Sequence, residues 1–342
     1  MRIGIVNDMM VATEALRRVV ALAPEHQVVW TAQDGAEAVR CCASDRPDLI
    51  LMDLIMPGMD GVEATRQIMA STPCAILIVT ASVDRNAART FAAMGHGALD
   101  AVDLPMLGSG DHAVSAQPLL NKLASLSRLV GDPSIGGPVP ERRGSGRLPP
   151  LLAVGASAGG PAALSAVLLD LPRDFPAGVV IIQHVDERFA AGMADWLNQH
   201  SALPVRLAVE GDQPAAGQVL LAGTSDHLVF KSAERLGYTQ KPAEEIYRPS
   251  VDVFFHSVCH WWQERAVGVL LTGMGSDGAI GLKALRDEGH HTIAQDSATS
   301  AVYGMPKAAA ALSAAVEILP LHSIASRLVT LVAPPGSGRS IP

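Results

Sequence analysis

Short apolar runs alternate with helical patterns over the first 130 residues. The runs are continuous rather than alternating in polarity, which is typical of parallel strands that are covered on both faces. They lie at 3–6, 28–31, 49–52, 75–79 and 98–102, with helical patterns between them at 12–23, 35–43, 61–69 and 84–94, and a last one at 115–130. Five strand–helix units predict a doubly wound α/β domain.

The same alternation resumes after residue 150. Expected strands lie at 151–154, 179–182, 267–271 and 292–294, and expected helices at 161–170, 190–199, 250–264, 278–288 and 305–313. Residues 203–241 show instead short strands and turns, which we interpret as a β insertion. The pattern predicts a second doubly wound α/β sheet.

One break in composition separates these two regions. Residues 131–149 contain five Gly, four Pro and two Ser, which is 11 of 19 residues and is typical of a linker. A similar stretch at 334–342 predicts a flexible tail. With 342 residues, two domains are expected: 1–130, then the linker, then 150–333 and the tail.

Composition and charge exclude several classes of protein. The chain is 49% apolar and 18% charged, so disorder is not expected. A net charge of −8 argues against nucleic acid as a partner. Four cysteines without a CxxC pair are typical of reduced thiols, and we find neither a signal-peptide core nor an apolar run of about 18 residues. We therefore expect a soluble cytoplasmic protein that is not inserted into a membrane.

Two carboxylates are expected to meet in the first domain. Asp8 follows the first strand and Asp53 ends the third, and these strands are neighbours in the flavodoxin-like order 2-1-3-4-5. Together they could hold a Mg²⁺ ion, and Asp53 could accept a phosphoryl group as nucleophile. Taken singly, Asp53 could merely close a turn and Asp8 could merely cap a helix.

Three motifs in this region resemble those of response-regulator receiver domains: VND at 6–8, LILMDLIMPGMDG at 49–61 and VTAS at 79–82. The resemblance implies that Asp53 is the phosphoacceptor, Asp8 and Asp53 bind Mg²⁺, and Thr80 senses the phosphoryl group.

The chain departs from the receiver pattern at three positions. Asn7 reduces the usual acidic pair, Leu104 stands where a lysine is usual, and Ala101 replaces the switch aromatic residue. Loss of the lysine removes a cation from the phosphoryl oxygens. Regulation that does not depend on phosphate therefore remains an alternative.

The second domain opens on LLAVGASAGGP at 151–161, an apolar strand that runs into a glycine-rich turn. Gly155, Ser157 and Gly159 satisfy GxSxG, the spacing of a turn that presents a serine nucleophile. Amides at the start of the next helix could stabilise an oxyanion. A dinucleotide-binding loop is a weak alternative, because Ser157 replaces its middle glycine. Ser157 could also be a simple turn residue.

A serine needs a base to take its proton, and His184 and Asp277 are the candidates. Both follow predicted strands at the same edge of the sheet as Ser157. Asp277 could instead cap the helix at 278–288, and His184 could simply be solvated. An order of Ser, Asp, His would use His290 or His291, but these two precede a strand at the opposite edge.

The loop around Asp277 is rich in glycine. Gly273, Gly275 and Gly278 leave it almost without side chains, which suggests that its backbone approaches a ligand closely. The amide of Met274 could then donate to the oxyanion.

Several long motifs resemble, in order, the catalytic domain of chemotaxis protein-glutamate methylesterases: GASAGGPAAL, IIQHV, YRPSVDVFFHSV, LLTGMGSDGA, TIAQD and YGMPKAA. The resemblance implies that Ser157 is the nucleophile, His184 the general base and Asp277 its orienting carboxylate. Ala158 stands where the family often has Thr, which leaves backbone amides for the oxyanion. The segments VNDMM and MGHGALDAVD resemble those of the Wsp-type branch of this family, which serves surface-sensing chemosensory arrays.

These resemblances imply a chemosensory hydrolase that needs no catalytic cofactor. It would remove methyl esters from glutamyl side chains of methylated chemoreceptors, deamidate glutamines, and be regulated through its receiver domain by a chemosensory histidine kinase. Arg248 could position the substrate or anchor the helix at 250. A general serine esterase and a non-catalytic adaptor with a degenerate receiver are the alternatives.

Overall fold

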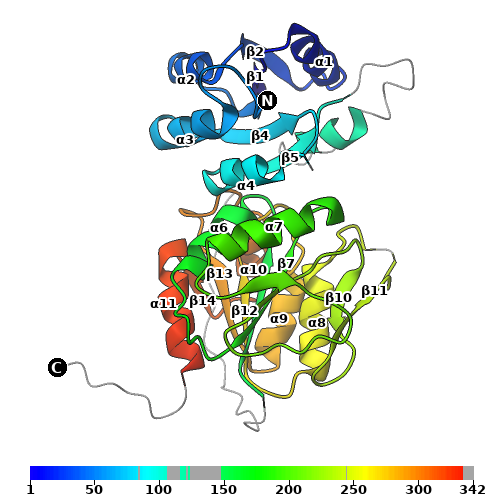
Figure 1. Ribbon diagram of the computed structural model, residues 1–342. Coiled ribbons are helices and arrows are strands. Elements are labelled where there is room, and N and C mark those ends of the chain that lie inside the picture. Colours follow the sequence, from blue (N-terminus) through cyan, green and yellow to red (C-terminus); the bar gives the residue numbers. More distant parts are fainter. Residues whose placement is uncertain (84, 106–115, 121, 124–147, 244, 334–342) are drawn as a thin grey trace, which may run out of the picture. The chain divides into compact units, whose positions relative to one another are not determined.

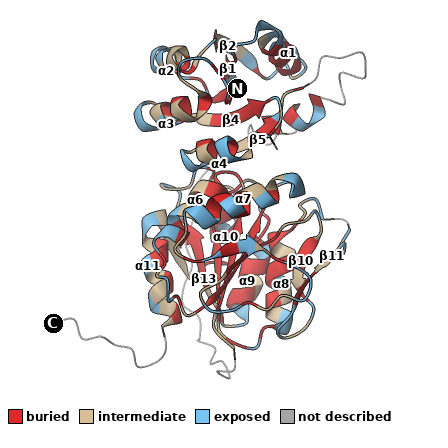
Figure 2. Ribbon diagram, in the orientation of Figure 1, coloured by how far each residue is buried: buried red, intermediate tan, exposed pale blue. Residues whose placement is uncertain are grey.

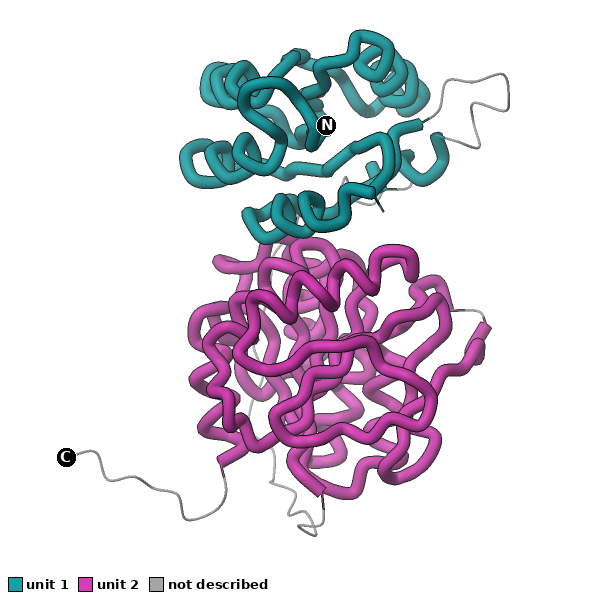
Figure 3. The backbone as a smooth tube through the Cα atoms, in the orientation of Figure 1, with its two compact units in different colours: residues 1–131 teal, residues 132–342 magenta. Residues whose placement is uncertain are grey.

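The computed structural model describes residues 1–83, 85–105, 116–120, 122–123, 148–243 and 245–333. The chain divides into two compact units, Met1–Gly131 and Asp132–Pro342 (Figure 3). Most of the predicted linker and all of the predicted tail lie outside the described residues. Each unit is an α/β structure with its own parallel sheet (Figure 1).

The sheet of the first unit has five parallel strands in the order β2-β1-β3-β4-β5, which confirms the flavodoxin-like topology. The strands are β1 (Arg2–Val6), β2 (Gln27–Ala32), β3 (Leu49–Met52), β4 (Ala75–Thr80) and β5 (Asp100–Asp103). All four residues of β3 are buried, as expected for a central strand covered on both faces. The neighbouring strand β4 is likewise buried over most of its length (Figure 2).

The first unit's helices are α1 (Met10–Ala21), α2 (Gly35–Ser44), α3 (Gly61–Ser71) and α4 (Ala87–Gly95). The side chains of Asp34 and Asp60 cap α2 and α3, each accepting from a main-chain amide three residues on. Residues 116–120 and 122–123 are helical and pack with α1 on one apolar cluster. The rest of the helix predicted at 115–130 lies outside the described residues.

The second unit is built on seven parallel strands in the order β14-β13-β12-β6-β7-β9-β8. They are β6 (Leu151–Ala156), β7 (Gly178–Gln183), β8 (Val205–Leu207), β9 (Val219–Leu221), β12 (Ala266–Leu270), β13 (His291–Gln295) and β14 (Glu317–Leu319). The prediction that 203–241 is an insertion is only partly right. β8 and β9 extend the main sheet, and only β10 (His227–Phe230) and β11 (Leu236–Thr239) form a separate antiparallel hairpin.

The helices of the second unit form two groups. α8 (Val251–Trp261), α9 (Ala279–Asp287) and α10 (Met305–Ala311) pack together and against the sheet through a buried cluster that includes Phe254, Leu282 and Met305. α6 (Gly160–Leu169) contacts α7 (Glu187–Gln199) and α11 (Leu321–Val332). No helix in the described ranges is long and apolar enough to cross a membrane.

Strand β6 lies at the point where the strand order reverses. It pairs with β7 on one side and with β12 on the other, so the carboxyl ends of these three strands share one edge. Ligand sites of open α/β sheets form outside this kind of edge, at this kind of reversal. The residues that follow β6, β7 and β12 therefore lie where a ligand site is expected.

Candidate active site

Ser157 follows β6 directly, on the turn that leads into α6. Its main-chain N–H donates to the carbonyl of Thr272 beyond β12, over 3.1 Å, and its own carbonyl accepts from Gly160 N–H over 2.7 Å. Gly159 between them has φ of 74°, and a Cβ there would lie 2.6 Å from the Cβ of Ala301. The turn therefore requires glycine at this position, and it leaves the side chain of Ser157 partly exposed at the edge.

His184 follows β7 in the same way. Ala156 and Gln183, the last residues of β6 and β7, are register partners, and the N–H of His184 donates to the Ala156 carbonyl over 3.1 Å. The side-chain amide of Gln183 donates to the carbonyls of Ser157 and His184, over 2.9 and 3.2 Å. These bonds fix the two candidate residues side by side on adjacent strand ends.

The imidazole of His184 is oriented by Asp277, which is buried. Its Nε2 lies 2.7 Å from Oδ2 of Asp277. The other ring nitrogen, Nδ1, is buried and has no hydrogen-bond partner within the described part of the chain. When Nε2–H donates to the carboxylate, Nδ1 carries the free lone pair and can accept a proton. In this tautomer the ring has the chemistry that a general base needs.

Asp277 is held by the start of α8 rather than by its own helix. Its two carboxylate oxygens accept from the Ser250 hydroxyl over 2.8 Å, from Val251 N–H over 2.7 Å and from Asp252 N–H over 3.0 Å. Burial opposes ionisation, but the bond and charge of His184 and these main-chain bonds hold the pKa of Asp277 below its usual value. The interpretation of Asp277 as the cap of the helix at 278–288 is therefore wrong.

The side chain of Asp252 bonds α9 in return. Gly281 N–H donates to Oδ1 of Asp252 over 2.6 Å. Asp252 of α8 therefore binds the N-terminal turn of α9, while Asp277, which precedes α9, binds the N-terminus of α8. Burial and the charge of Asp277 raise the pKa of Asp252 to about 6. Of the two neighbouring carboxylates, Asp277 therefore keeps its charge more firmly.

The glycines of the 273–278 loop have close neighbours within the chain itself. A Cβ at Gly273 would lie 2.2 Å from Sδ of Met305 and 2.8 Å from Cβ of Ser157. The loop therefore passes directly beside the serine, with Met274 as the next residue. Ala158 is the residue directly after Ser157 in the chain. Both candidate oxyanion residues, Met274 and Ala158, therefore belong to segments that adjoin Ser157.

The structure also places the other candidates of the second unit. Nδ1 of His290 accepts from the N–H of Ala266, at the start of β12, and His291 opens β13 and pairs with Glu317. Both histidines thus lie at the amino ends of strands, away from the Ser157 edge. Arg248 donates to the main-chain carbonyl of Ala243 over 2.5 Å.

Two residues that the sequence analysis missed complete the surroundings of His184. The ring of Tyr247 stacks on the imidazole, and Ser250 donates to Asp277. A signal for Ser250 was available, since a serine before the apolar run VDVFF is typical of a helix N-cap, and Ser250 does cap α8. No pattern in the sequence signals the stack of Tyr247, which joins segments 63 residues apart.

In the first unit, Asp53 directly follows β3 and is hydrogen-bonded to Asn7. The Asn7 amide donates to Oδ2 of Asp53 over 3.0 Å, while its own oxygen accepts from Met9 N–H over 2.8 Å. Burial raises the pKa of Asp53, and the charge of Asp8 contributes to the increase. Asp8 is exposed and does not cap α1, because the cap position is Met9.

The remaining receiver candidates lie near the ends of β4 and β5. Thr80 is buried, and its hydroxyl accepts from the side-chain amide of Asn86 over 3.1 Å. Leu104, at the lysine position, packs against the apolar core of this unit, and Ala101 is buried. No positive charge is supplied from either of these two positions.

The oxygen chemistry of this pocket fits a Mg²⁺ ion. Asp8 and Asp53 are close enough for the charge of one to raise the pKa of the other, and carboxylate oxygens are the ligands this ion prefers. Asn7, whose oxygen is already bonded, offers the pocket a donor instead. Within the described ranges, no group of three or more His, Cys, Asp or Glu residues gathers to hold a metal.

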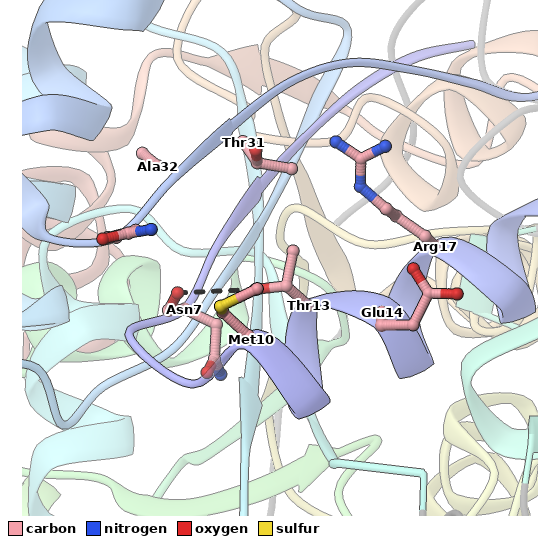
Figure 4. Close-up of a pocket in the computed structure, with 8 residues that line it drawn as sticks. Asn7, Met10, Thr13, Glu14, Arg17, Thr31 and Ala32 are labelled. Carbon is pink, nitrogen blue, oxygen red and sulfur yellow. Dashed lines mark hydrogen bonds between the residues drawn. The ribbon is translucent and has the colours of Figure 1, made fainter.

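A separate cavity of about 360 Å³ lies beside α1 (Figure 4). Asn7 and Met10 line one side of it and Arg17 the other, and the hydroxyl of Thr13 donates to the Asn7 carbonyl over 3.4 Å. Asp53 is not among its lining residues. The cavity therefore adjoins the acid pocket at Asn7, which donates to Asp53, but it does not include Asp53 itself.

Comparison with known proteins identifies both units. Residues 152–328 match the family model described as CheB methylesterase, and residues 3–106 match the response regulator receiver domain. The catalytic domain of CheB methylesterase from Thermotoga maritima is 32% identical, with a TM-score of 0.51, over 54% of this chain and 99% of that one.

Two relatives extend the match to the full length. A protein-glutamate methylesterase/protein-glutamine glutaminase of Burkholderia thailandensis is 60% identical over 97% of this chain and 98% of its own. One of Pseudomonas putida, from a group 3 operon, is also 60% identical, over 97% of this chain and all of its own. These names do not identify a Wsp-type branch, which stays a prediction. The chain belongs to the CheB methylesterase family and carries a receiver domain in front of its catalytic domain.

Proposed function

We propose that the protein hydrolyses the methyl esters of glutamyl side chains on chemoreceptors and deamidates glutamines there. The observation that carries the proposal is the contact of His184 Nε2 with Asp277 Oδ2, 2.7 Å, at the sheet edge where Ser157 lies. Relatives with 60% identity are named for both activities.

In the first half of the reaction, Oγ of Ser157 attacks the ester carbonyl while Nδ1 of His184 takes its proton. The charge that develops on the carbonyl oxygen is met by the amides of Ala158 and Met274. The imidazolium then returns its proton to the leaving oxygen, and methanol departs. A general base is worth about 10²–10⁴-fold in rate, and each oxyanion donor about 2.7–4 kcal/mol.

In the second half, water attacks the acyl-serine and His184 takes its proton. Collapse of the second tetrahedral intermediate releases the glutamate carboxylate and restores the Ser157 hydroxyl. A glutamine side chain follows the same course with ammonia as the leaving group, because its amide passes through a similar tetrahedral intermediate. Asp277 keeps its charge throughout and stabilises the imidazolium.

Methanol release from a chemoreceptor cytoplasmic fragment with labelled methyl esters tests this function. The intact protein should release methanol, and Ser157→Ala should reduce the rate by at least about 10³-fold. Ser225→Ala, a serine in the loop after β9, is the matched control and should keep the parental rate. Equal rates for Ser157→Ala and the parent would refute the proposal.

The receiver domain is proposed to regulate this activity through phosphorylation of Asp53 by a chemosensory histidine kinase. Asp8 and Asp53 would hold Mg²⁺, which when bound neutralises charge on the phosphoryl oxygens. Thr80 would sense the phosphoryl group. Asn7 removes a negative charge from the pocket and Leu104 removes a positive one. Because both changes weaken the usual binding of the metal and the phosphoryl group, we expect phosphorylation to be slow.

Transfer of phosphate from acetyl phosphate to the intact chain tests this part. The parent should take up label and Asp53→Asn should not, whereas Leu104→Lys should take it up faster because it restores a cation. Label that persists in Asp53→Asn would place the acceptor elsewhere. If the parent takes up none, control that does not depend on phosphate is favoured.

We propose a cytoplasmic protein whose partners are proteins rather than nucleic acid. Arg248 is proposed to position the substrate, although one of its N–H groups already bonds Ala243. The alternative esterase that uses His290 or His291 is not favoured, because Asp277 bonds His184 and both other histidines lie at the opposite edge. A non-catalytic adaptor is not favoured either, because Ser157, His184 and Asp277 are all present and Asp277 bonds His184.

A further inference from the structure

The flat face of the His184 ring is covered by Tyr247. The two ring centroids are 4.4 Å apart and the ring planes differ by 3°, which is a parallel stack. Tyr247 lies in the segment between β11 and α8, three residues before Ser250. Its neighbour Ile246 is 89% exposed, whereas Tyr247 itself is half-buried, so Tyr247 turns inward where the residue before it faces solvent.

The phenol end of Tyr247 reaches the glycine loop that carries Asp277. A Cβ at Gly275 would lie 2.7 Å from Oη of Tyr247, and Gly275 has φ of 79°. The one side chain therefore touches both the imidazole and the loop two residues before its carboxylate partner. Burial and the charge of Asp277 raise the pKa of Tyr247, so the phenol stays neutral.

A single hydrogen bond does not fix the plane of an imidazole. Within the described residues, the ring of His184 is hydrogen-bonded only through Nε2, and a tilt of the ring about that bond would change the direction in which Nδ1 points. A stacked aromatic ring removes this freedom, and its electron-rich face also attracts the imidazolium that forms when Ser157 gives up its proton. Both effects act on the catalytic step rather than on substrate binding.

We propose that Tyr247 is a positioning residue of the hydrolytic site, which holds the imidazole of His184 in plane so that Nδ1 faces the serine. The proposal rests on the function proposed above. It requires the aromatic ring and not the hydroxyl, because the stack uses the face of the ring. The ring is predicted to raise kcat and to leave KM unchanged.

Steady-state hydrolysis by Tyr247→Leu and Tyr247→Phe separates these roles. Tyr247→Leu should lower kcat by about 10-fold, the scale of one aromatic contact, with KM within about 2-fold of the parent. Tyr247→Phe should restore kcat. Parental kcat in Tyr247→Leu, an equal loss in both variants, or a change in KM alone would overturn the proposal.

Tyr238→Leu is the matched control for a merely structural tyrosine. Tyr238 donates to the Ala208 carbonyl over 3.0 Å and accepts from Gly223 N–H over 2.9 Å, so its loss should lower the melting temperature with little change in kcat. A kcat loss in Tyr238→Leu as large as that in Tyr247→Leu would show a general effect of destabilisation and would overturn the proposal.

An NMR measurement keeps the test independent of the substrate. The stacked ring should shift the imidazole proton signals of His184 upfield in the parent and in Tyr247→Phe, and Tyr247→Leu should lose the shift. If the parent shows this shift but releases no methanol from receptor, the proposed function fails while the stack stands. Absence of the shift in an active parent would overturn the role of Tyr247 alone.

Discussion

Replacement of Asp277 by Asn tests how the carboxylate orients His184. The change keeps the size of the side chain but removes its charge and one acceptor. Oδ1 of Asp277 accepts from Ser250 and Asp252, and Oδ2 from His184 and Val251. An amide has only one oxygen, so at least one of these donors must face an NH₂ group.

The size of the effect follows from this count. One unpaired main-chain donor costs about 1–3 kcal/mol of stability. If the amide donates to Nε2 of His184, the ring carries its proton on Nδ1 and cannot accept one from Ser157. If it does not, the imidazolium still loses its counter-charge. Loss of the orienting carboxylate in serine hydrolases lowers kcat by about 10⁴-fold, so we expect about 10³–10⁴-fold here, or about 4–5.5 kcal/mol.

The assay is methanol release at pH 7 together with urea unfolding of each variant. Asp252→Asn is the control, since it makes the same change on the neighbouring carboxylate and should keep parental kcat. Because the pKa of Asp277 is lowered on folding, its contribution to stability is present above the unfolded value near 3.8 and is lost as the pH falls below it. A folded Asp277→Asn protein with kcat within about 10-fold of the parent would refute the reasoning.

Two further predictions concern the surroundings of the site. The pKa of Asp252 rises from 3.8 to about 6 on folding, so the folded parent binds more protons and loses stability as the pH rises through this interval. Asp252→Asn should therefore gain stability relative to the parent between pH 4 and pH 7 in urea unfolding, and a constant difference would contradict this. Gly273→Ala places a Cβ 2.2 Å from Met305 Sδ, so it should lower stability by about 1–3 kcal/mol and reduce kcat through the adjoining Ser157. If the free energy of unfolding and kcat of this variant equal those of the parent, the loop accommodates the extra methyl group without cost and the prediction is wrong.

The sequence predicts those parts of the site that depend on the ends of strands. Ser157, His184 and Asp277 each follow an apolar run, and the parallel order of β7, β6 and β12 brings these ends to one edge. This prediction succeeds because a buried parallel strand leaves a strong local signal in the sequence. The same logic placed His290 and His291 at the opposite edge, where the structure has them.

Contacts between distant segments could not be predicted in this way. Asp277 bonds the N-terminus of α8, and the chain's periodicity does not reveal that α8 and α9 begin side by side. The segment YRPS therefore points to Arg248 rather than to Tyr247 and Ser250. The loop glycines likewise suggest a nearby ligand, although Gly273 and Gly275 have close side-chain neighbours within the chain.

The elements missed at the end of the second unit have a local cause. β14 is a three-residue strand at the edge of the sheet, and all three of its residues are partly exposed, so it shows neither a buried run nor an alternation. α11 follows Pro320 with no side-chain cap. Short edge strands and uncapped helix starts leave weak signals, and this region is defined by tertiary contacts, namely the pairing of β14 with β13 and the contact of α11 with α6.

Covalent labelling with a phosphonofluoridate tests the central claim most directly, because this reagent phosphonylates an activated serine and the adduct persists. Mass spectrometry of the labelled intact protein should find one equivalent on Ser157, and His184→Gln should react about 10²–10⁴-fold more slowly. Label on another residue, or the parental labelling rate in His184→Gln, would contradict the account.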